Sequence, residues 1–299
     1  MKKRMDLFET INEKCLREYQ FFTCDICDEL CSVDKKDCGY DCAKCLQKIH
    51  FNGTRNYDCT KMSYRYVCSY SNRYASEIVY LLKGLSPLGV KKKLKVLSIG
   101  CGPCTELIAL DYLKRTGKYC FDECDFYGID KNAGMWDDLY NDFRNVVEFN
   151  KFHIVKKDAI EAFSEVKDSG WKPDLIFMQY FLSNLNKYNG EGRVNQFVES
   201  FARYVNEQVL PGCYIVINDI NLTKDRGGAQ DYLDIIGNAI YHQKVWKGHF
   251  RTDNSDSIDC LRYGVTLNTT DVLFDPLYTV RYGTKSAKKC GSAWIVIKR

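Results

Sequence analysis

The sequence lacks long hydrophobic runs and has no strong excess of charge of either sign. No apolar stretch approaches the ~20 residues that a membrane-spanning helix needs. The first residues are basic, but the apolar segment of a secretion signal does not follow them. A net charge of +4 falls short of the strongly basic balance of a dedicated nucleic-acid-binding protein. These absences predict a cytoplasmic protein that does not contact a membrane.

Cysteine, by contrast, is unusually abundant. The chain has 16 cysteines in 299 residues, and nine of them fall within the first 68 residues. Without a secretion signal, metal binding explains such a cluster better than a disulfide framework does. A chain of this length can hold one large domain and a small module. We therefore predict a Cys-rich metal-binding module over residues 1–60, a helical bridge over 61–90 and a large domain over 91–299.

The cysteines of the N-terminal module form short pairs. Two Cys-x-x-Cys turns can deliver four thiolates to a tetrahedral zinc ion, and they predict a first site at Cys24, Cys27, Cys42 and Cys45. A second site, with less regular spacing, would use Cys31, Cys38, His50 and Cys59. An iron–sulfur cluster held by some of these thiols is the competing interpretation. Cys15 and Cys68 fit better as buried small hydrophobic residues.

Apolar and aromatic residues recur at helical spacing between residues 62 and 82. Each step of the series is three or four residues: Tyr64, Val67, Tyr70, Tyr74, Ile78 and Leu81. The spacing predicts a helix that ends near Gly84, with Pro87 beyond it. Core packing is the first interpretation of its aromatic face.

Beyond this helix, short apolar runs alternate with helical patterns. The runs cover residues 94–99, 126–129, 152–155, 175–177, 214–217 and 294–297. The clearest helical face lies between the fourth and fifth runs, at Val194, Phe197, Val198, Phe201, Val205 and Val209. This alternation predicts a parallel sheet covered by helices on both faces. Residues 278–282 and 292–298 flank a glycine- and lysine-rich turn and predict a terminal antiparallel hairpin.

A glycine turn follows the first of these strands, in the sequence Val96-Leu97-Ser98-Ile99-Gly100-Cys101-Gly102-Pro103-Cys104-Thr105-Glu106. It lacks the third glycine of the dinucleotide fingerprint and the Gly-Lys-Ser/Thr of a phosphate loop. The segment resembles the first motif of the class I S-adenosylmethionine (SAM) methyltransferases. Two residues depart from that motif, because Ser98 replaces the usual acid and Cys104 replaces the last glycine. The resemblance implies a Rossmann-like, doubly wound α/β fold with a mostly parallel seven-stranded sheet and a C-terminal antiparallel hairpin.

The resemblance also implies a cofactor site for SAM at the carboxyl ends of the strands. The turn of Gly100, Cys101, Gly102 and Pro103 would face the methionine part of SAM. Asp130, followed by Lys131, would accept hydrogen bonds from the ribose hydroxyls, although it could instead cap the helix that starts there. Asp158, followed by Ala159, would accept one from the adenine amino group. The lid helix of many such enzymes would bring Tyr70 or Tyr74 near the cofactor.

The methyl acceptor is expected beside the end of the fourth strand, within residues 174–184. This segment lacks the Asn/Asp-Pro-Pro-aromatic signature of adenine amino methylation and the Pro-Cys signature of pyrimidine C5 methylation. Gln179, Tyr180 and Asn184 are candidate acceptor-positioning residues, and Gln179 is also a candidate cofactor contact. Packing is an equally good interpretation of Tyr180. Asn218 and Asp219, after the fifth strand, add a polar pair beside the expected pocket.

The predicted function is therefore that of a SAM-dependent methyltransferase with a zinc-stabilised N-terminal module. RNA is the first acceptor candidate, because residues 241–251 interleave basic and aromatic side chains in what would be a loop. An ordinary amphipathic loop whose aromatic side chains pack on the sheet is at least as good an interpretation of these residues. A protein or small-molecule methyltransferase whose module recruits a protein partner is the second hypothesis. A non-catalytic binding protein on the same scaffold is the third, because Ser98 and Cys104 depart from the motif.

Overall fold

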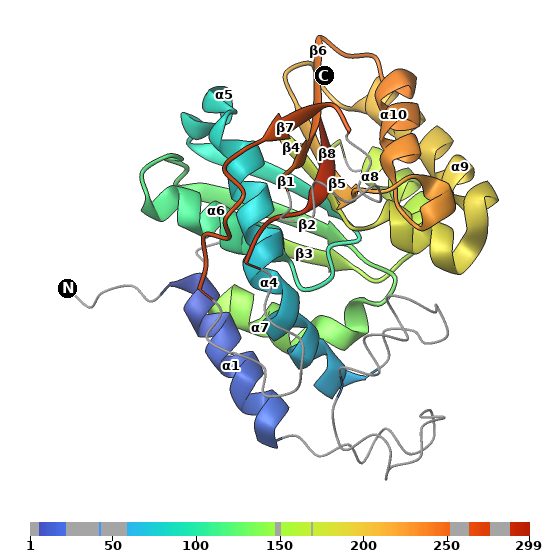
Figure 1. The fold of residues 1–299 in the computed structure, drawn as a ribbon. Coiled ribbons are helices and arrows are strands. Elements are labelled where there is room, and N and C mark those ends of the chain that lie inside the picture. Colours follow the sequence, from blue (N-terminus) through green and yellow to red (C-terminus); the bar gives the residue numbers. More distant parts are fainter. Residues whose placement is uncertain are drawn as a thin grey trace.

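The computed structural model describes residues 6–21, 42, 59–146, 151–168, 170–251, 263–275 and 288–299. In these segments the chain forms one sheet of eight strands, in the order β3-β2-β1-β4-β5-β8-β6-β7 (Figure 1). The strands are β1 (Lys93–Ile99), β2 (Glu123–Ile129), β3 (Lys151–Val155), β4 (Leu175–Gln179), β5 (Tyr214–Ile220), β6 (Lys244–Phe250), β7 (Val265–Leu267) and β8 (Ser292–Lys298). The six predicted apolar runs each fall on a strand, and the first five pair in parallel as expected.

Helices cover both faces of this sheet, so the molecule has three layers (Figure 1). One face packs against α1 (Leu7–Phe21), α4 (Thr60–Lys83), α6 (Thr105–Arg115), η3 (Ala133–Trp136) and α7 (Asp137–Val146). The other face packs against α8 (Ala159–Asp168), α9 (Leu182–Gln208) and α10 (Gln230–Ala239). The short helices α5 (Ser86–Gly89) and η4 (Lys224–Arg226) lie in connections. The described residues thus form the doubly wound α/β architecture that the alternating pattern predicts.

Strand β1 shows how one sequence supplies both layers. Leu94 and Val96 belong to the hydrophobic cluster under α4 and α6, whereas Leu97 and Ile99 belong to the cluster under α8 and α9. Side chains alternate between the faces of a strand, so a strand with helices on both sides needs apolar residues at nearly every position. Ser98 is the buried polar exception, and it faces the α6 side with Leu94 and Val96.

The predicted helix before the sheet is confirmed. Helix α4 spans Thr60–Lys83 and ends at the C-cap Gly84. Its apolar stripe packs against α1 and α6 over one face of the sheet. None of the helices in the described residues is long and apolar enough to cross a membrane.

The C-terminal strand β8 is antiparallel, as expected, but it is inserted between two strands. It pairs with β5 on one side and with β6 on the other. The expected hairpin partner, residues 278–282, lies outside the described residues. In the described chain the antiparallel partners of β8 are β5 and β6, which the polar sequence of β6 did not reveal. The short β7 pairs in parallel with β6 and adds an eighth strand to the seven predicted.

Residues 241–251 are largely a strand and not the loop that the sequence suggested. His249 is buried in β6, where its ring contacts the Tyr263 carbonyl and the Thr266 hydroxyl. Lys247 pairs with Asp234 at 2.9 Å, and Lys244 lies over the Trp246 ring. The first residues of β6, Lys244–Lys247, are exposed or half-buried, whereas the last three, Gly248–Phe250, are buried. Both interpretations of this segment placed it in a loop, whereas residues 244–250 form a strand of the sheet.

Two of the eight predicted metal ligands belong to the described residues. Cys24, Cys27, Cys31, Cys38, Cys45 and His50 lie outside the described residues. Cys42 and Cys59 are described and buried. In the segments that the structure covers, no group of three or more His, Cys, Asp or Glu side chains could hold a metal ion. Cys15 and Cys68 are buried in the core, as predicted for both.

Candidate functional site

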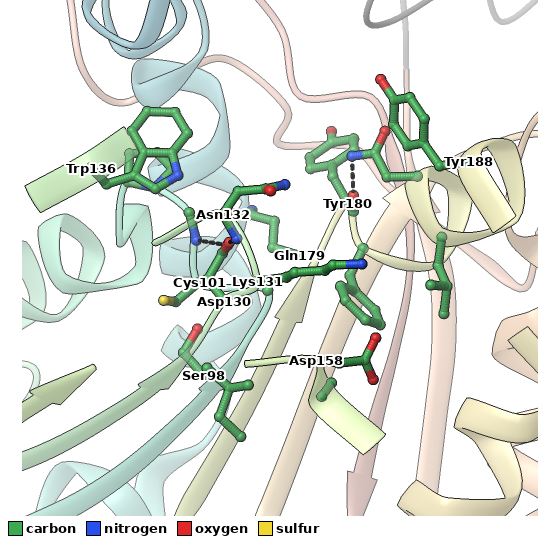
Figure 2. Close-up of a pocket in the computed structure, with 18 of the residues that line it drawn as sticks. Ser98, Cys101, Asp130, Lys131, Asn132, Trp136, Asp158, Gln179, Tyr180 and Tyr188 are labelled. Atoms are coloured by element: carbon green, nitrogen blue, oxygen red, sulfur yellow. Dashed lines mark hydrogen bonds between the residues drawn. The ribbon is translucent and has the colours of Figure 1, made fainter. Parts of the chain in front are cut away.

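A cavity of about 930 Å³ lies at the carboxyl ends of the central parallel strands (Figure 2). It is lined by residues that follow β1, β2, β3 and β4, by one face of α4 and by the first turns of α9. All nine residues that the sequence assigned to the cofactor line it, namely Gly100, Cys101, Gly102, Pro103, Asp130, Lys131, Asp158, Ala159 and Gln179. Tyr180 and Asn184 line it as well. The topology thus brings these separate segments to one place.

The turn after β1 depends on left-handed backbone conformations. Gly100 and Gly102 have φ angles of 64° and 45°. A Cβ at Gly100 would also lie 2.5 Å from a ring carbon of Phe181, so this position requires glycine twice over. Cys104 has φ 52° and ψ 46°, the conformation that a glycine would adopt without strain. The replacement of the motif's last glycine by Cys104 therefore changes the side chain but keeps a backbone conformation that glycine favours.

Tyr140 and Asp130 hold this turn in place. The Tyr140 hydroxyl on α7 donates to the Gly102 carbonyl at 2.8 Å and contacts the Cys101 sulfur at 3.7 Å. Asp130 Oδ2 accepts from the Gly102 amide at 2.8 Å. Adjacent parallel strands place Asp130 next to the glycine turn, because Ile129 of β2 pairs with Ile99 of β1.

Asp130 caps the turn that follows β2 and also lines the cavity. Its Oδ1 accepts from the Asn132 amide at 2.7 Å, which caps the turn that leads into η3. The carboxylate also faces the cavity. Burial raises its pKa, and the two backbone donors lower it in part. Each carboxylate oxygen has a second lone pair, so both oxygens can accept a further hydrogen bond from a ligand.

A buried acid, Glu106, lies beside Ser98, the serine that stands where the methyltransferase motif usually has an acid. Glu106 is in the first turn of α6, is 3% exposed and lines the cavity. Its carboxyl is hydrogen-bonded to the Ser98 side chain of β1. Sequence reasoning missed this residue, since a Glu in a first helical turn is usually a solvated partner of the helix dipole. The replacement of the motif's acid by Ser98 is therefore accompanied by a nearby acid, Glu106, from helix α6.

Asp158 and Ala159 lie where β3 leads into α8. Asp158 Oδ1 accepts from the Ile160 amide and pairs with Arg193 at 2.8 Å. Arg193 belongs to α9, just after a break at Gly190, where φ is 77°. Residues on both sides of this break line the cavity, Tyr188 and Asn189 before it and Arg193 and Phe197 after it. The helix also packs on the sheet on both sides of the break, through Leu182 before it and Val194 after it.

The polar ends of Gln179 and Tyr180 are engaged within the protein. Gln179 accepts from the Thr105 hydroxyl at 2.7 Å and donates to the Tyr74 carbonyl at 3.0 Å. The Tyr180 hydroxyl donates to Glu77 at 2.9 Å. Asn184 donates to the Tyr180 carbonyl at 2.8 Å, as drawn in Figure 2. These contacts give Gln179 and Tyr180 a clear structural role beside the cavity.

Asn218 and Asp219 lie outside the cavity and hold two of the helices that line it, α4 and α9. Asn218 donates to Glu77 at 2.8 Å, and Asp219 accepts from the amides of Leu182 and Ser183 at the start of α9. Both residues are fully buried, and neither lines the cavity.

Helix α4 contributes an aromatic wall to the cavity. Tyr66 and Tyr74 line it together with Trp136 and Tyr180. The Tyr74 and Tyr180 rings stack with centroids 4.1 Å apart, and Tyr66 meets Trp136 edge to face at 5.6 Å. Tyr70 stacks on Tyr74 from outside this wall. Flat rings on one side and backbone polar groups on the other suit a ligand with a planar ring and polar substituents.

No protein-family profile matches this sequence, and no curated protein matches it either. Among solved structures, precorrin-6y C5,15-methyltransferase from Geobacter metallireducens GS-15 has 15% identity and a TM-score of 0.43, covering 75% of this chain and 88% of that one. The plantazolicin methyltransferase BpumL in complex with SAH has 13% identity and a TM-score of 0.40, covering 97% and 99%.

TrmN from Thermus thermophilus has 10% identity and a TM-score of 0.37, covering 85% of this chain and 53% of that one. The chain thus spans about half the length of TrmN. At these identities and TM-scores, the similarity assigns neither an activity nor a substrate to the chain.

Proposed function

We propose that the protein is a SAM-dependent methyltransferase. The observation that carries this proposal is the single cavity in which the Gly100–Gly102 turn, Asp130 and Asp158 meet at three neighbouring strand ends. A ligand with an amino-acid end, a ribose and a purine has complementary groups along this series. The left-handed glycines allow close approach to the backbone, and the carboxylates accept from hydroxyl and amino groups.

The residues that would hold SAM fit it chemically. Asp130 would accept from the ribose hydroxyls while keeping its backbone donors, and Asp158 would accept from the adenine amino group. SAM itself supplies the activated methyl group. The chain's residues orient the acceptor and exclude water, which is where the aromatic wall of Tyr66, Tyr74 and Trp136 contributes.

Compensation of the two motif departures favours this proposal over a non-catalytic scaffold. Cys104 keeps the left-handed turn that glycine would make. Glu106 brings a carboxyl group to the buried position next to Ser98. A scaffold that had lost its ligand would be under no physical need for strained backbone and a buried acid at this place.

For the acceptor we propose a flat base of RNA. The aromatic wall suits stacking, and the exposed cations Lys131 and Lys157 line the same cavity. Residues 241–246 do not add to this support, because β6 runs parallel to β5 and begins at the opposite edge of the sheet. A protein or a small molecule is the alternative acceptor.

We further propose that the N-terminal cysteines bind zinc and stabilise a module that recognises the substrate or a protein partner. The support is the spacing of Cys24, Cys27, Cys42 and Cys45. Metal analysis of the purified protein tests it, and a fully folded protein without metal would refute it.

Replacement of Asp130 tests the cofactor site. Asp130→Asn removes the charge and one acceptor, so SAM affinity is expected to fall about 10- to 100-fold, the range of a charge-assisted hydrogen bond. Titration calorimetry measures it, with the exposed Asp225→Asn as the matched control. Unchanged affinity in Asp130→Asn, or no SAM binding by the unaltered protein, would contradict the proposal.

Labelled SAM tests the acceptor. We expect label from the methyl group to enter a macromolecular fraction of a cell extract, and to be released by ribonuclease and not by protease. Retention of the protein on bulk RNA should fall steeply with salt. Label that resists ribonuclease would replace RNA with a protein or small-molecule acceptor.

A further inference from the structure

Glu106 is an unusual residue for the start of a helix. It follows Thr105 in α6, and first-turn acids normally point into solvent near the helix N-terminus. Here the side chain is 3% exposed and lines the cavity beside Ser98 and Gly100. A carboxyl group buried at a cavity wall carries a large desolvation cost unless a cation or several donors face it.

The surroundings of Glu106 supply few hydrogen-bond donors and no cation for its buried carboxyl. Among the described residues, its Oε1 is buried without a hydrogen-bond partner. The groups that act on it are the Ser98 side chain, the Glu106 backbone and the neighbouring Asp130, and none of them is a cation. The thiols of Cys101 and Cys104 are close as well.

Burial and Asp130 raise the pKa of Glu106 to about 7, while Ser98 and its own backbone lower it in part. The carboxyl is therefore poised between its neutral and ionised forms near neutral pH. An unpaired acceptor at a cavity wall is best explained by a donor that arrives with a ligand.

We propose that Glu106 binds the ammonium group of the methionine part of SAM, at the place where Ser98 leaves room for it. This inference rests on the proposed function and assigns a specificity residue within it. An acidic side chain at position 98 of β1, where the motif usually has one, would reach the same region. In this chain the negative charge comes instead from Glu106 on α6. Ser98 then acts as a positioning residue that orients the carboxyl through its hydroxyl.

Binding of an ammonium group by Glu106 should be linked to the release of a proton from the carboxyl. A bound ammonium group favours the ionised carboxylate, so binding removes a proton from the fraction of molecules in which Glu106 is neutral. That fraction falls from about 90% at pH 6 to about 10% at pH 8 for a group that titrates near 7. Affinity for a ligand with the ammonium group should therefore rise about tenfold over this range, and fall again at higher pH, where the ligand's amino group loses its proton.

Two nucleosides distinguish the contribution of Glu106 to ligand binding from that of the rest of the site. S-Adenosylhomocysteine carries the ammonium group, whereas 5′-methylthioadenosine has the same adenosine without the amino-acid end. Calorimetric titration at pH 6, 7 and 8 should show the tenfold rise for the first and none for the second. Because both share the ribose, titration of Asp130 affects them equally. Buffers of different ionisation enthalpy should report proton release for S-adenosylhomocysteine alone.

Variants of this pair of residues sharpen the test. Glu106→Gln matches the neutral carboxyl in shape, so it should fold; it should bind S-adenosylhomocysteine at least tenfold more weakly at pH 8, without pH dependence. Its affinity for 5′-methylthioadenosine should not change. Ser98→Ala removes a donor that favours the carboxylate, and should move the midpoint of the pH dependence upward. The exposed Glu199→Gln on α9 is the matched control and should behave as the unaltered protein.

The results distinguish a wrong role for Glu106 from a wrong proposed function. If both nucleosides bind but Glu106→Gln leaves S-adenosylhomocysteine affinity and its pH dependence unchanged, the role of Glu106 is overturned and the proposed function stands. The Ser98→Ala titration decides the same point if Glu106→Gln does not fold, because an unmoved midpoint also overturns the role. If neither nucleoside binds the unaltered protein, the proposed function itself fails.

Discussion

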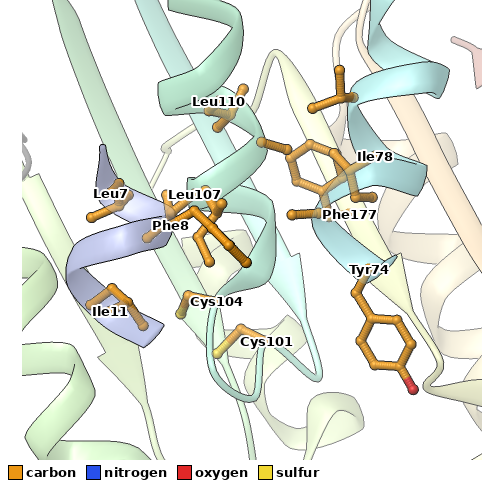
Figure 3. Close-up of a cluster of buried hydrophobic side chains, with 14 of the residues drawn as sticks. Leu7, Phe8, Ile11, Tyr74, Ile78, Cys101, Cys104, Leu107, Leu110 and Phe177 are labelled. Carbon is orange, nitrogen blue, oxygen red and sulfur yellow. The ribbon is translucent and has the colours of Figure 1, made fainter. Parts of the chain in front are cut away.

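Cys104 combines a strained backbone with a buried side chain. A non-glycine residue in the left-handed region costs about 1–2 kcal/mol, yet the Cys104 thiol is fully buried. It lies in a hydrophobic cluster with Leu7 and Phe8 of α1 and Leu107 of α6, as Figure 3 shows. Burial of the thiol therefore offsets the strain of the turn, and the same residue links the Gly100–Gly102 turn to the N-terminal helix α1.

Replacement of Cys104 should separate these two effects. Cys104→Ala keeps the strain and loses the sulfur, so we expect a loss of about 1 kcal/mol in the free energy of unfolding. Cys104→Gly removes more apolar surface but also the strain, and should be more stable than Cys104→Ala by about 1 kcal/mol. Urea denaturation of both variants measures this order. Greater stability of the alanine variant would show that the turn is not strained.

At the scale of elements, Glu77 of α4 connects the helix to the sheet. It is buried and accepts from the Tyr180 hydroxyl at the end of β4, from the Asn218 amide group on β5 and from the Gly291 backbone before β8. Burial raises its pKa, and nearby Arg73 opposes the rise. A single carboxylate thus fixes α4 over the strand ends that border the cavity.

Removal of Glu77 should therefore loosen the wall of the cavity. Glu77→Ala removes the acceptor of the Tyr180 hydroxyl, the Asn218 amide group and the Gly291 backbone N–H in a buried place, so we expect the free energy of unfolding to fall by about 3–5 kcal/mol. Glu77→Gln keeps one acceptor and should cost less. Urea denaturation measures both, and the exposed Glu199→Ala should change stability by under about 0.5 kcal/mol. A small effect of Glu77→Ala would mean that α4 is held by apolar packing alone.

At the scale of the whole molecule, buried acids make stability depend on pH. Burial raises the pKa of Glu106, Asp130, Glu77 and Asp219. A raised pKa means that the folded state binds more protons than the unfolded state. The contribution of each group is therefore fully present below its unfolded pKa and is lost as pH rises through its folded pKa.

For Glu106 this range extends from the ordinary value of 4.5 to about 7. The shift corresponds to about 3 kcal/mol, which the ligand-free protein should lose between about pH 4.5 and 7. Glu106→Gln does not titrate, so its stability relative to the unaltered protein should increase by about this amount over the same range. Urea denaturation at several pH values checks this. A difference that stays constant with pH would contradict the raised pKa.

The architecture and the approximate place of the site follow from the amino-acid pattern. Apolar runs such as 94–99 and 214–217 predict buried strands, because a strand covered on both faces needs apolar residues at nearly every position. Gly100, Asp130 and Asp158 could be grouped from sequence alone, because the carboxyl ends of parallel strands meet at one edge. These inferences need only local patterns and a general rule of topology.

The assembly of the site, by contrast, depends on how side chains that are distant in the sequence pack together. Glu106 faces Ser98, and Gln179 and Tyr180 turn their polar ends toward α4, about 100 residues away in the chain. Such contacts depend on the direction of each side chain in the packed molecule, which no local pattern encodes. For the same reason β6 could be recognised as a strand only through its partner β8, because its basic and aromatic alternation fits a solvated loop as well as a half-buried strand.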